Sequence, residues 1–400
     1  MPVRKRDSSG TGRAWLALFS IVLSAALPLA AAGEFTLSPY LDYHYSSNIF
    51  WDVNQVGDAA FSPGLGIEFS TNSWNVFLAA DGRFYRENDF LNSSLVTGGF
   101  NLFKVFSART SLFISPEFSI ASYRDDLSFL DTAAPGLTLG VKHALSNRIF
   151  SRLGLGARYS DYLNEDSYDR LRLSAFLELS AFFPTQTTLR LTTGIHYLLF
   201  PHIRVPSTSS TWNPSLPATA SAADDRPVTP PAREPAPAAS AIDLAIPQPY
   251  LALRAAQGLG FKTGIVAELL YRRNLDPLQG LQSIAASEWA LEQTDEDFFW
   301  EGTRLSLGLK TEAVLGLEIT LDFSHFQKEY RGIEALDLDG IPVKPLVFRS
   351  DTLTQAALRV SRRIGGLGLF VSGSLRRNDS NDLYFRYDSY TISAGAELSI

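Results

Sequence analysis

The sequence predicts an all-β fold, a transmembrane antiparallel up-and-down β-barrel of about 16 strands, within a range of about 14 to 18. Two observations support it. Segments that alternate apolar and polar residues recur from residue 34 to residue 400. The connections between them alternate between short and long, as in outer-membrane barrels, whose periplasmic turns are short and whose extracellular loops are long.

The first 32 residues have the composition of a secretory signal peptide. Arg4, Lys5, Arg6 and Arg13 provide a basic region, an apolar stretch follows over 14–29, and three alanines end it at position 32. We expect cleavage after residue 32, so residues 33–400 would form a single outer-membrane barrel. No other stretch reaches the roughly 18 apolar residues of a spanning helix, so any membrane span is expected to consist of strands.

Alternation alone predicts sixteen strands. They lie at about 34–46, 60–70, 74–86, 93–104, 107–123, 133–145, 148–162, 168–183, 186–201, 248–258, 262–273, 299–310, 313–327, 348–361, 366–377 and 386–400. Connections after even-numbered strands are brief, and those after odd-numbered strands are longer, up to 202–247. An even number of strands returns both termini to the periplasm.

The segment at 168–183 illustrates how the register is fixed. Leu173 and Leu177 share one face with other apolar residues, and Arg172 and Glu178 share the opposite face. A slip of one residue would turn these charges toward lipid, where an arginine at the midplane costs about 2–4 kcal/mol. A soluble β-sandwich would also alternate, but its strands average about five or six residues, roughly half the length found here.

Composition excludes several function classes. The formal charge is −7, and loss of Arg4, Lys5, Arg6, Arg13 and Asp7 with the signal leaves about −10, so nucleic acid is not an expected partner. The chain has no cysteine, which excludes disulfides, thiolate metal sites and cysteine nucleophiles. The five histidines form no metal-binding or nucleophile motif. The sequence therefore predicts no catalytic residues, no metal, no cofactor and no enzyme activity.

Two Gly-x-Gly strings do not indicate nucleotide-binding loops. Gly154-Leu155-Gly156 and Gly258-Leu259-Gly260 lack the strand-to-helix setting that a phosphate-binding loop needs. Their glycines are better interpreted as small lumen-facing residues or turns.

Two connections have distinct compositions. Residues 206–246 are rich in Pro, Ala, Ser and Thr, which predicts a disordered extracellular loop; a tether or partial plug is the alternative. In the connection at 274–298, Asp276-Pro277 resembles a helix start, and Leu278, Leu281 and Ile284 follow at helical spacing. We expect a short helix there, either constricting the pore or packing on the rim.

The same register predicts which charged side chains line the lumen. Both signs occur, so these groups must be hydrated or paired, and their near balance predicts no strong ion selectivity. A barrel of sixteen strands is wide enough to hold water. The predicted pore-lining residues are Arg83, Glu117, Arg158, Arg172, Glu178, Arg190, Arg254, Glu268, Arg304, Glu318, Asp322 and Arg359.

The C-terminal residues resemble the assembly signal of outer-membrane barrels. Ser393, Gly395, Leu398 and Ile400 stand at its polar, glycine and hydrophobic positions, with Leu398 and Ile400 in place of the usual aromatics. The resemblance implies recognition by the barrel-assembly machinery and a location in the Gram-negative outer membrane, in contact with lipid and lipopolysaccharide. The oligomeric state stays open, because lipid-facing and protomer-facing surfaces are both apolar.

A second resemblance concerns the first two strands. Residues 45–50 (YSSNIF) and 61–66 (FSPGLG) look like the opening of porin-like barrel families of Gram-negative bacteria. This implies a channel, in some relatives associated with exopolysaccharide export. The sequence thus favours passive passage of small hydrophilic solutes. An exopolysaccharide port and a non-conducting surface or adhesin barrel that acts through its loops remain as alternatives.

Overall fold

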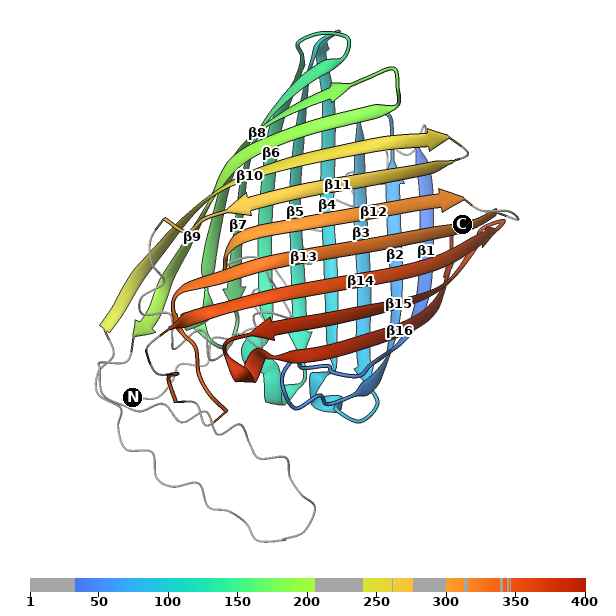
Figure 1. Ribbon diagram of the computed structural model, residues 1–400. Coiled ribbons are helices and arrows are strands. Elements are labelled where there is room, and N and C mark those ends of the chain that lie inside the picture. Colours follow the sequence, from blue (N-terminus) through green and yellow to red (C-terminus); the bar gives the residue numbers. More distant parts are fainter. Residues whose placement is uncertain are drawn as a thin grey trace.

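The computed structural model describes residues 33–205, 240–260, 262–275, 300–312, 316–338, 341–343, 345 and 347–400. Sixteen antiparallel strands form one closed barrel in which each strand pairs with its neighbours in the chain and β1 pairs with β16 (Figure 1). The predicted all-β barrel of sixteen strands is confirmed. Among the described residues, no helix is long and apolar enough to cross a bilayer.

The strand bounds follow the predicted alternation. They are β1 Glu34–Ser46, β2 Asp58–Ser70, β3 Trp74–Tyr85, β4 Ser93–Ser107, β5 Thr110–Tyr123, β6 Thr132–Ala144, β7 Ile149–Tyr162, β8 Arg170–Phe182, β9 Thr187–Val205, β10 Ser240–Gly260, β11 Thr263–Arg272, β12 Glu301–Glu312, β13 Leu317–Glu334, β14 Phe348–Ile364, β15 Leu367–Ser380 and β16 Tyr387–Leu398. Short 3₁₀ turns lie in four of the longer connections: η2 Asp89–Leu91, η3 Asp125–Leu130, η4 Asp166–Tyr168 and η6 Leu383–Phe385.

Strand β10 begins eight residues earlier than the sequence predicted. It starts at Ser240, so the predicted loop at 206–246 extended too far, and the segment from 206 to 239 lies outside the described residues. Pro247 lies in the predicted connection at 202–247, and Pro249 lies inside the predicted strand at 248–258. The carbonyls of Pro247 and Pro249 accept hydrogen bonds from the N–H groups of Leu275 and Arg273, just beyond the end of β11. The proline nitrogens therefore face that segment and not β9. The ladder with β9 is therefore unaffected.

The two faces of the sheet differ as the alternation predicted. Leu173, Leu177 and Leu179 of β8 are about 40% exposed on the outer face, as are leucines, valines and phenylalanines of the other strands. On the inner face of the same strand, Glu178 lies 3.5 Å from Arg190 of β9. An apolar outer band around a polar interior is the pattern of a barrel that sits in a bilayer.

Glycines keep the inner wall thin where aromatic rings lie against it. A Cβ at Gly140 would collide with the ring of Phe113, and one at Gly154 with the ring of Phe176. Each ring therefore lies over a neighbouring strand instead of projecting across the lumen. Gly154 is a small lumen-facing residue, as predicted, and Gly260 has a φ of +79° in the turn before β11.

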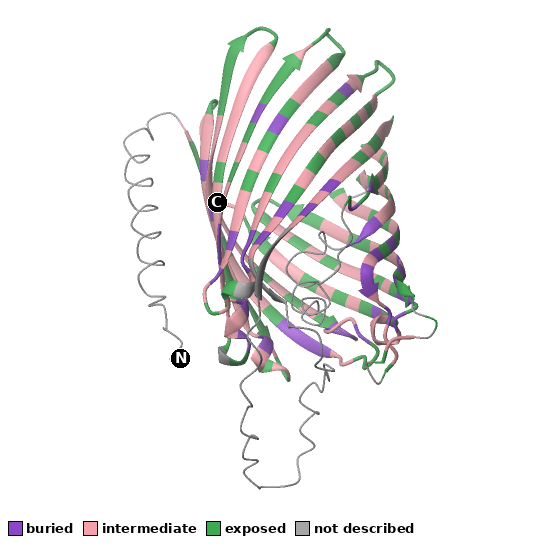
Figure 2. Cartoon of the chain, turned by 90° about the vertical axis from the view of Figure 1, so that its left-hand side faces the viewer, coloured by how far each residue is buried: buried purple, intermediate pink, exposed green. Residues whose placement is uncertain are grey.

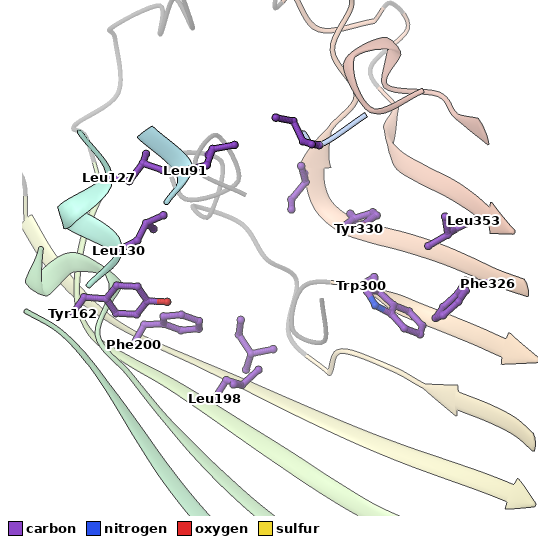
Figure 3. Close-up of a cluster of buried hydrophobic side chains, with 13 residues drawn as sticks. Leu91, Leu127, Leu130, Tyr162, Leu198, Phe200, Trp300, Phe326, Tyr330 and Leu353 are labelled. Atoms are coloured by element: carbon purple, nitrogen blue, oxygen red, sulfur yellow. The ribbon is translucent and has the colours of Figure 1, made fainter. Parts of the chain in front are cut away.

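The two ends of the barrel are packed differently. Buried residues gather mostly toward the end that carries the long connections, which we call the loop end (Figure 2). A hydrophobic cluster there combines inner-face side chains of several strands with residues of the connections (Figure 3). Its members are Ile49, Leu91, Leu127, Leu130, Tyr162, Leu198, Phe200, Ile246, Trp300, Phe326, Tyr330, Ile333 and Leu353. Side chains on the inner wall are consequently packed against the connections at the loop end.

The assignment of faces can be tested by placing arginine on each side of β12. Leu307 is 46% exposed on the outer face, and Ser306 lies on the inner face beside Glu268 and Ser324. We expect Leu307→Arg to lower the free energy of unfolding in lipid vesicles by about 2–4 kcal/mol. The matched Ser306→Arg should cost much less, because water and Glu268 accommodate its charge. Equal losses in denaturant titrations of the two variants would contradict the assignment.

Candidate functional site

The candidate functional site is the inner face of the barrel, where the cross-strand register places all twelve of the charged side chains that were expected to line the pore. On one side, Glu117, Gly136, Arg158 and Arg172 occupy successive positions across β5 to β8. Farther round, Arg190, Arg254 and Glu268 are paired across β9 to β11. The remaining members are Arg83 of β3, Glu178 of β8, Arg304 of β12, Glu318 and Asp322 of β13 and Arg359 of β14.

Several of these groups form ion pairs along the wall. Arg158 lies 3.1 Å from Glu117, Arg190 lies 3.5 Å from Glu178, and Arg304 lies 2.6 Å from Glu268. Lys310 pairs with Glu318 at 2.9 Å, with both side chains well exposed. Pairs that water reaches contribute about 0–1 kcal/mol each, so their main effect is to hold the charges at fixed places on the wall.

The signs nearly balance in the lumen as a whole, but they are not spread evenly around the ring. Between the short turns and the buried loop end, the register places Lys142, Arg152, Arg158, Arg172, Arg190, Arg254, Arg304 and Lys310 on β6 to β12, with Glu178, Glu268 and Glu312 as the acids. The other strands carry Glu34, Asp42, Glu68, Asp81, Glu117, Glu318, Asp322 and Glu397, with Arg83, Arg359, Arg363 and Arg376 as the bases. We call these the basic arc and the acidic arc.

Three side chains of the basic arc form a group that sequence reasoning did not connect. The rings of His196 and Tyr250 stack at 4.7 Å with an interplanar angle of 12°, and the guanidinium of Arg172 lies 3.5 Å from Nε2 of His196. Nearby, Arg254 is exposed and makes no hydrogen bond or ion pair within the described chain. An exposed guanidinium beside other cations attracts anions from the lumen.

Access to the lumen differs between its ends. The side chains of Lys310 and Glu318, near the short turns, are 63% and 44% exposed. At the loop end, Leu198, Ile246, Trp300 and Leu353 are at most 2% exposed, and the guanidinium of Arg272 stacks 3.3 Å from the ring of Trp300. The sequence prediction missed this packing, although residues 197–200 (YLLF) indicate it. They are apolar on both faces, as in strands buried on both sides.

A buried polar cluster fixes β14 and β15 at the loop end. Arg349 and Asp351 pair at 2.7 Å with both side chains at most 2% exposed, and Ser380 and Asn378 also donate to Asp351. The guanidinium of Arg349 lies 3.5 Å from the ring of Phe385 in η6. Buried charges are tolerated when paired and hydrogen-bonded in this way.

The connection after β15 links this cluster to the connection after β1. Burial raises the pKa of the Asp382 carboxyl, although its bonds from the N–H groups of Leu336 and Tyr384 oppose that shift. The hydroxyl of Tyr384 donates to Asp52 at 3.1 Å, and burial, with the nearby Asp52 charge, raises the pKa of that phenol. Both connections are therefore held by buried and half-buried polar contacts.

Comparisons with known proteins bear on the fold. No family model and no curated protein matches the sequence. Among solved structures, CdiB from Acinetobacter baumannii is 8% identical, with a TM-score of 0.50 over 91% of this chain and 60% of that chain. OpdO from Pseudomonas aeruginosa is 10% identical over 92% and 97% of the two chains, with a TM-score of 0.49. OpdK, an outer membrane protein of the same organism, is 13% identical over 92% and 99%, with a TM-score of 0.46.

The closed ring of strands, its apolar exterior and its charged interior decide the class. The chain is a sixteen-stranded outer-membrane β-barrel. In such a barrel the short turns face the periplasm and the loop end faces outward.

The four residues of the predicted assembly signal lie where the barrel closes. Ser393 bonds Ser372 at 2.6 Å on the inner face, and Leu398 is exposed on the outer face. Ile400 exchanges two backbone hydrogen bonds with Leu37 of β1, each 3.0 Å long. A Cβ at Gly395 would lie 2.5 Å from the carbonyl oxygen of Leu41 and from the ring of Phe370, so glycine is required for this close approach.

Two further expectations fall outside the described residues. These are the signal peptide at 1–32 and the short helix after Asp276-Pro277. Both stay predictions.

The buried pair on β14 can be compared with an exposed pair of the same spacing on β15. Asp351→Asn leaves the buried guanidinium of Arg349 without its carboxylate and should lower the free energy of unfolding by about 3–5 kcal/mol. Asp379→Asn removes the partner of Arg377, in a pair whose side chains are 53–66% exposed, and should cost less than about 1 kcal/mol. Heat-dependent unfolding in detergent micelles measures both. Similar melting temperatures for the two variants would show that the buried pair is not stabilising.

Proposed function

We propose that this barrel is a passive outer-membrane channel for small hydrophilic solutes and not an enzyme. The observation that carries the proposal is the inner face, where charged side chains of both signs line a lumen that is exposed toward the short turns. Such groups cannot lie in a dry interior without full pairing, so they indicate a water-filled vestibule.

The packed loop end limits what can pass. Trp300 and Leu353 are buried on the inner face, and the hydrophobic cluster surrounds them. This arrangement favours a narrow route for small solutes over a wide port for a polymer. It also supports a second candidate, a non-conducting surface barrel whose connections act outside the cell.

The surroundings of the barrel follow from its location. We propose that the apolar outer face contacts lipid and the outer rim contacts lipopolysaccharide, and that the closing strand β16 is read by the barrel-assembly machinery. The stretch 393–400 supports the last point because it combines the signal-like pattern with the contacts that close the ring.

Single-channel recording in planar bilayers separates the two candidates. We expect residues 33–400, refolded, to give steady conductance steps. The double variant Trp300→Ala/Leu353→Ala should give larger steps, because it removes packing from the narrow end. A variant without residues 206–239 tests the segment before β10 and spares that strand. If none of the three proteins conducts, although a heat-modifiability gel shows that each is folded, the channel is rejected in favour of the surface barrel.

The two arcs predict a measurable ion preference. Replacing Arg172 and Arg254 in the basic arc by glutamine should shift the anion-to-cation permeability ratio toward cations by about fivefold, since a unit charge 4 Å away contributes about 1 kcal/mol in water. The matched pair Arg83→Gln/Arg359→Gln removes the same charge from the acidic arc. It should shift the permeability ratio toward cations by a different amount, because it affects only the ions that pass along that wall. Reversal potentials in a potassium chloride gradient measure both. An equal shift would mean that the arcs act only through net charge.

A further inference from the structure

A small pocket opens in the inner wall formed by β13 to β16. It has a volume of about 240 Å³, and Trp51 from the connection after β1 forms part of its lining. Ligand pockets for drug-sized molecules usually measure about 300–1,000 Å³, so this one suits a single small solute. The sequence placed Asp322 and Arg376 on the lumen side but did not bring the polar side chains of this pocket together.

Trp51 is held in the pocket by a structured connection. Its φ is +53°, a left-handed conformation that bulky residues rarely adopt. On its two sides, the Asn48 side chain donates to the Asp52 carbonyl at 2.7 Å, and the Val53 N–H donates to the Tyr384 carbonyl at 3.0 Å. Backbone strain of this kind persists only where neighbouring contacts fix it, and it concentrates at functional positions.

The pocket combines an aromatic ring with groups that bind hydroxyls. The guanidinium of Arg376 lies 4.0 Å from the centroid of the Trp51 ring, which stays partly exposed. Asp322 is exposed and makes no hydrogen bond or ion pair within the described chain. Gln355 adds an amide, and serines and a threonine of β13, β15 and β16 add hydroxyls.

We infer that this pocket is a binding subsite for a neutral monosaccharide. A pyranose ring has an apolar face that can pack on an indole, and its edge carries hydroxyls in every direction. The free carboxylate of Asp322 can accept two of these hydroxyls in charge-assisted bonds, while Gln355 and the serines serve as donors or acceptors for others. The ring and the polar groups are thus complementary to one class of solute.

The surrounding charge selects against ionic solutes. The pocket lies in the acidic arc, whose carboxylates repel sugar acids and other anions. A zwitterionic amino acid could pair with Asp322 and Arg376. However, the guanidinium of Arg376 lies against the Trp51 ring, and hydroxyl and amide groups outnumber charged ones in the lining. A neutral sugar uses more of the pocket.

The inference deepens the proposed channel function and rests on it for its biological meaning, but binding can be measured without conduction. Saturation-transfer NMR of methyl α-glucopyranoside with full-length mature protein in detergent reports equilibrium binding. We expect saturable binding that Trp51→Ala and Asp322→Asn each weaken about tenfold or more, since a hydrogen bond to a charged group or a buried aromatic contact accounts for that ratio.

Matched controls come from the same lumen. Phe176→Ala removes an aromatic from the basic arc, and Asp81→Asn removes a carboxylate from β3; neither lines the pocket, and both should leave binding unchanged. Conductance of each variant is recorded separately, so a silent pore with intact binding would reject the channel and keep the subsite.

Three results would overturn the subsite. The first is no saturable binding by a conducting wild-type protein. The second is binding that survives both pocket substitutions or falls equally in the controls. The third is tighter binding of lysine or glycine than of the glucoside, lost in Asp322→Asn, which would identify an amino-acid site instead.

Discussion

Closure of the ring is the constraint on which the rest of this molecule depends. In a bilayer no water is available for unpaired backbone groups, so every strand needs a partner on each side. Here β1 pairs with both β2 and β16, and the two bonds between Leu37 and Ile400 complete the seam. Once the ring is closed, each residue of a strand faces either lipid or lumen. The chemistry of the lumen is then set by the parity of each position, as β8 and β12 show.

An up-and-down barrel maps the order of the chain directly onto the circumference. A local bias in the sequence therefore becomes a wall of the lumen. Strands β6 to β12 form one continuous stretch rich in inward arginine and lysine, and they become the basic arc. The acidic arc is built from both ends of the chain, because closure brings β13 to β16 beside β1 to β5. The whole-chain balance of charge conceals this separation, whereas the strand order makes it evident.

The sequence was sufficient where a periodic pattern determined the result. It located sixteen strands, the lipid-facing leucines and the inner face of residues such as Arg172 and Glu178. Prediction from the sequence failed where contacts between separate segments determine the structure. The predicted strand began at 248 and missed the first part of β10, and only the contacts of Pro247 and Pro249 with residues beyond β11 show that their nitrogens need no partner from β9. The packing of the Arg349–Asp351 pair against Phe385 joins β14 to η6, and the position of Trp51 beside Arg376 joins the connection after β1 to β15. Alternation carries no signal for either contact.

The pocket and the packed loop end belong to one connected structure. The backbone around Trp51 is bonded to Tyr384 through Val53, and the Tyr384 hydroxyl is bonded to Asp52. The ring of the next residue, Phe385, lies against the guanidinium of Arg349. The same guanidinium also contacts the ring of Tyr330, which is a member of the hydrophobic cluster. A solute that packs on Trp51 would thus act on a residue whose supports lead, by direct contacts, to the cluster that narrows the barrel. The connections after β1 and β15 therefore contact both regions: Trp51 lines the pocket, Ile49 belongs to the cluster, and Phe385 packs on Arg349 beside it.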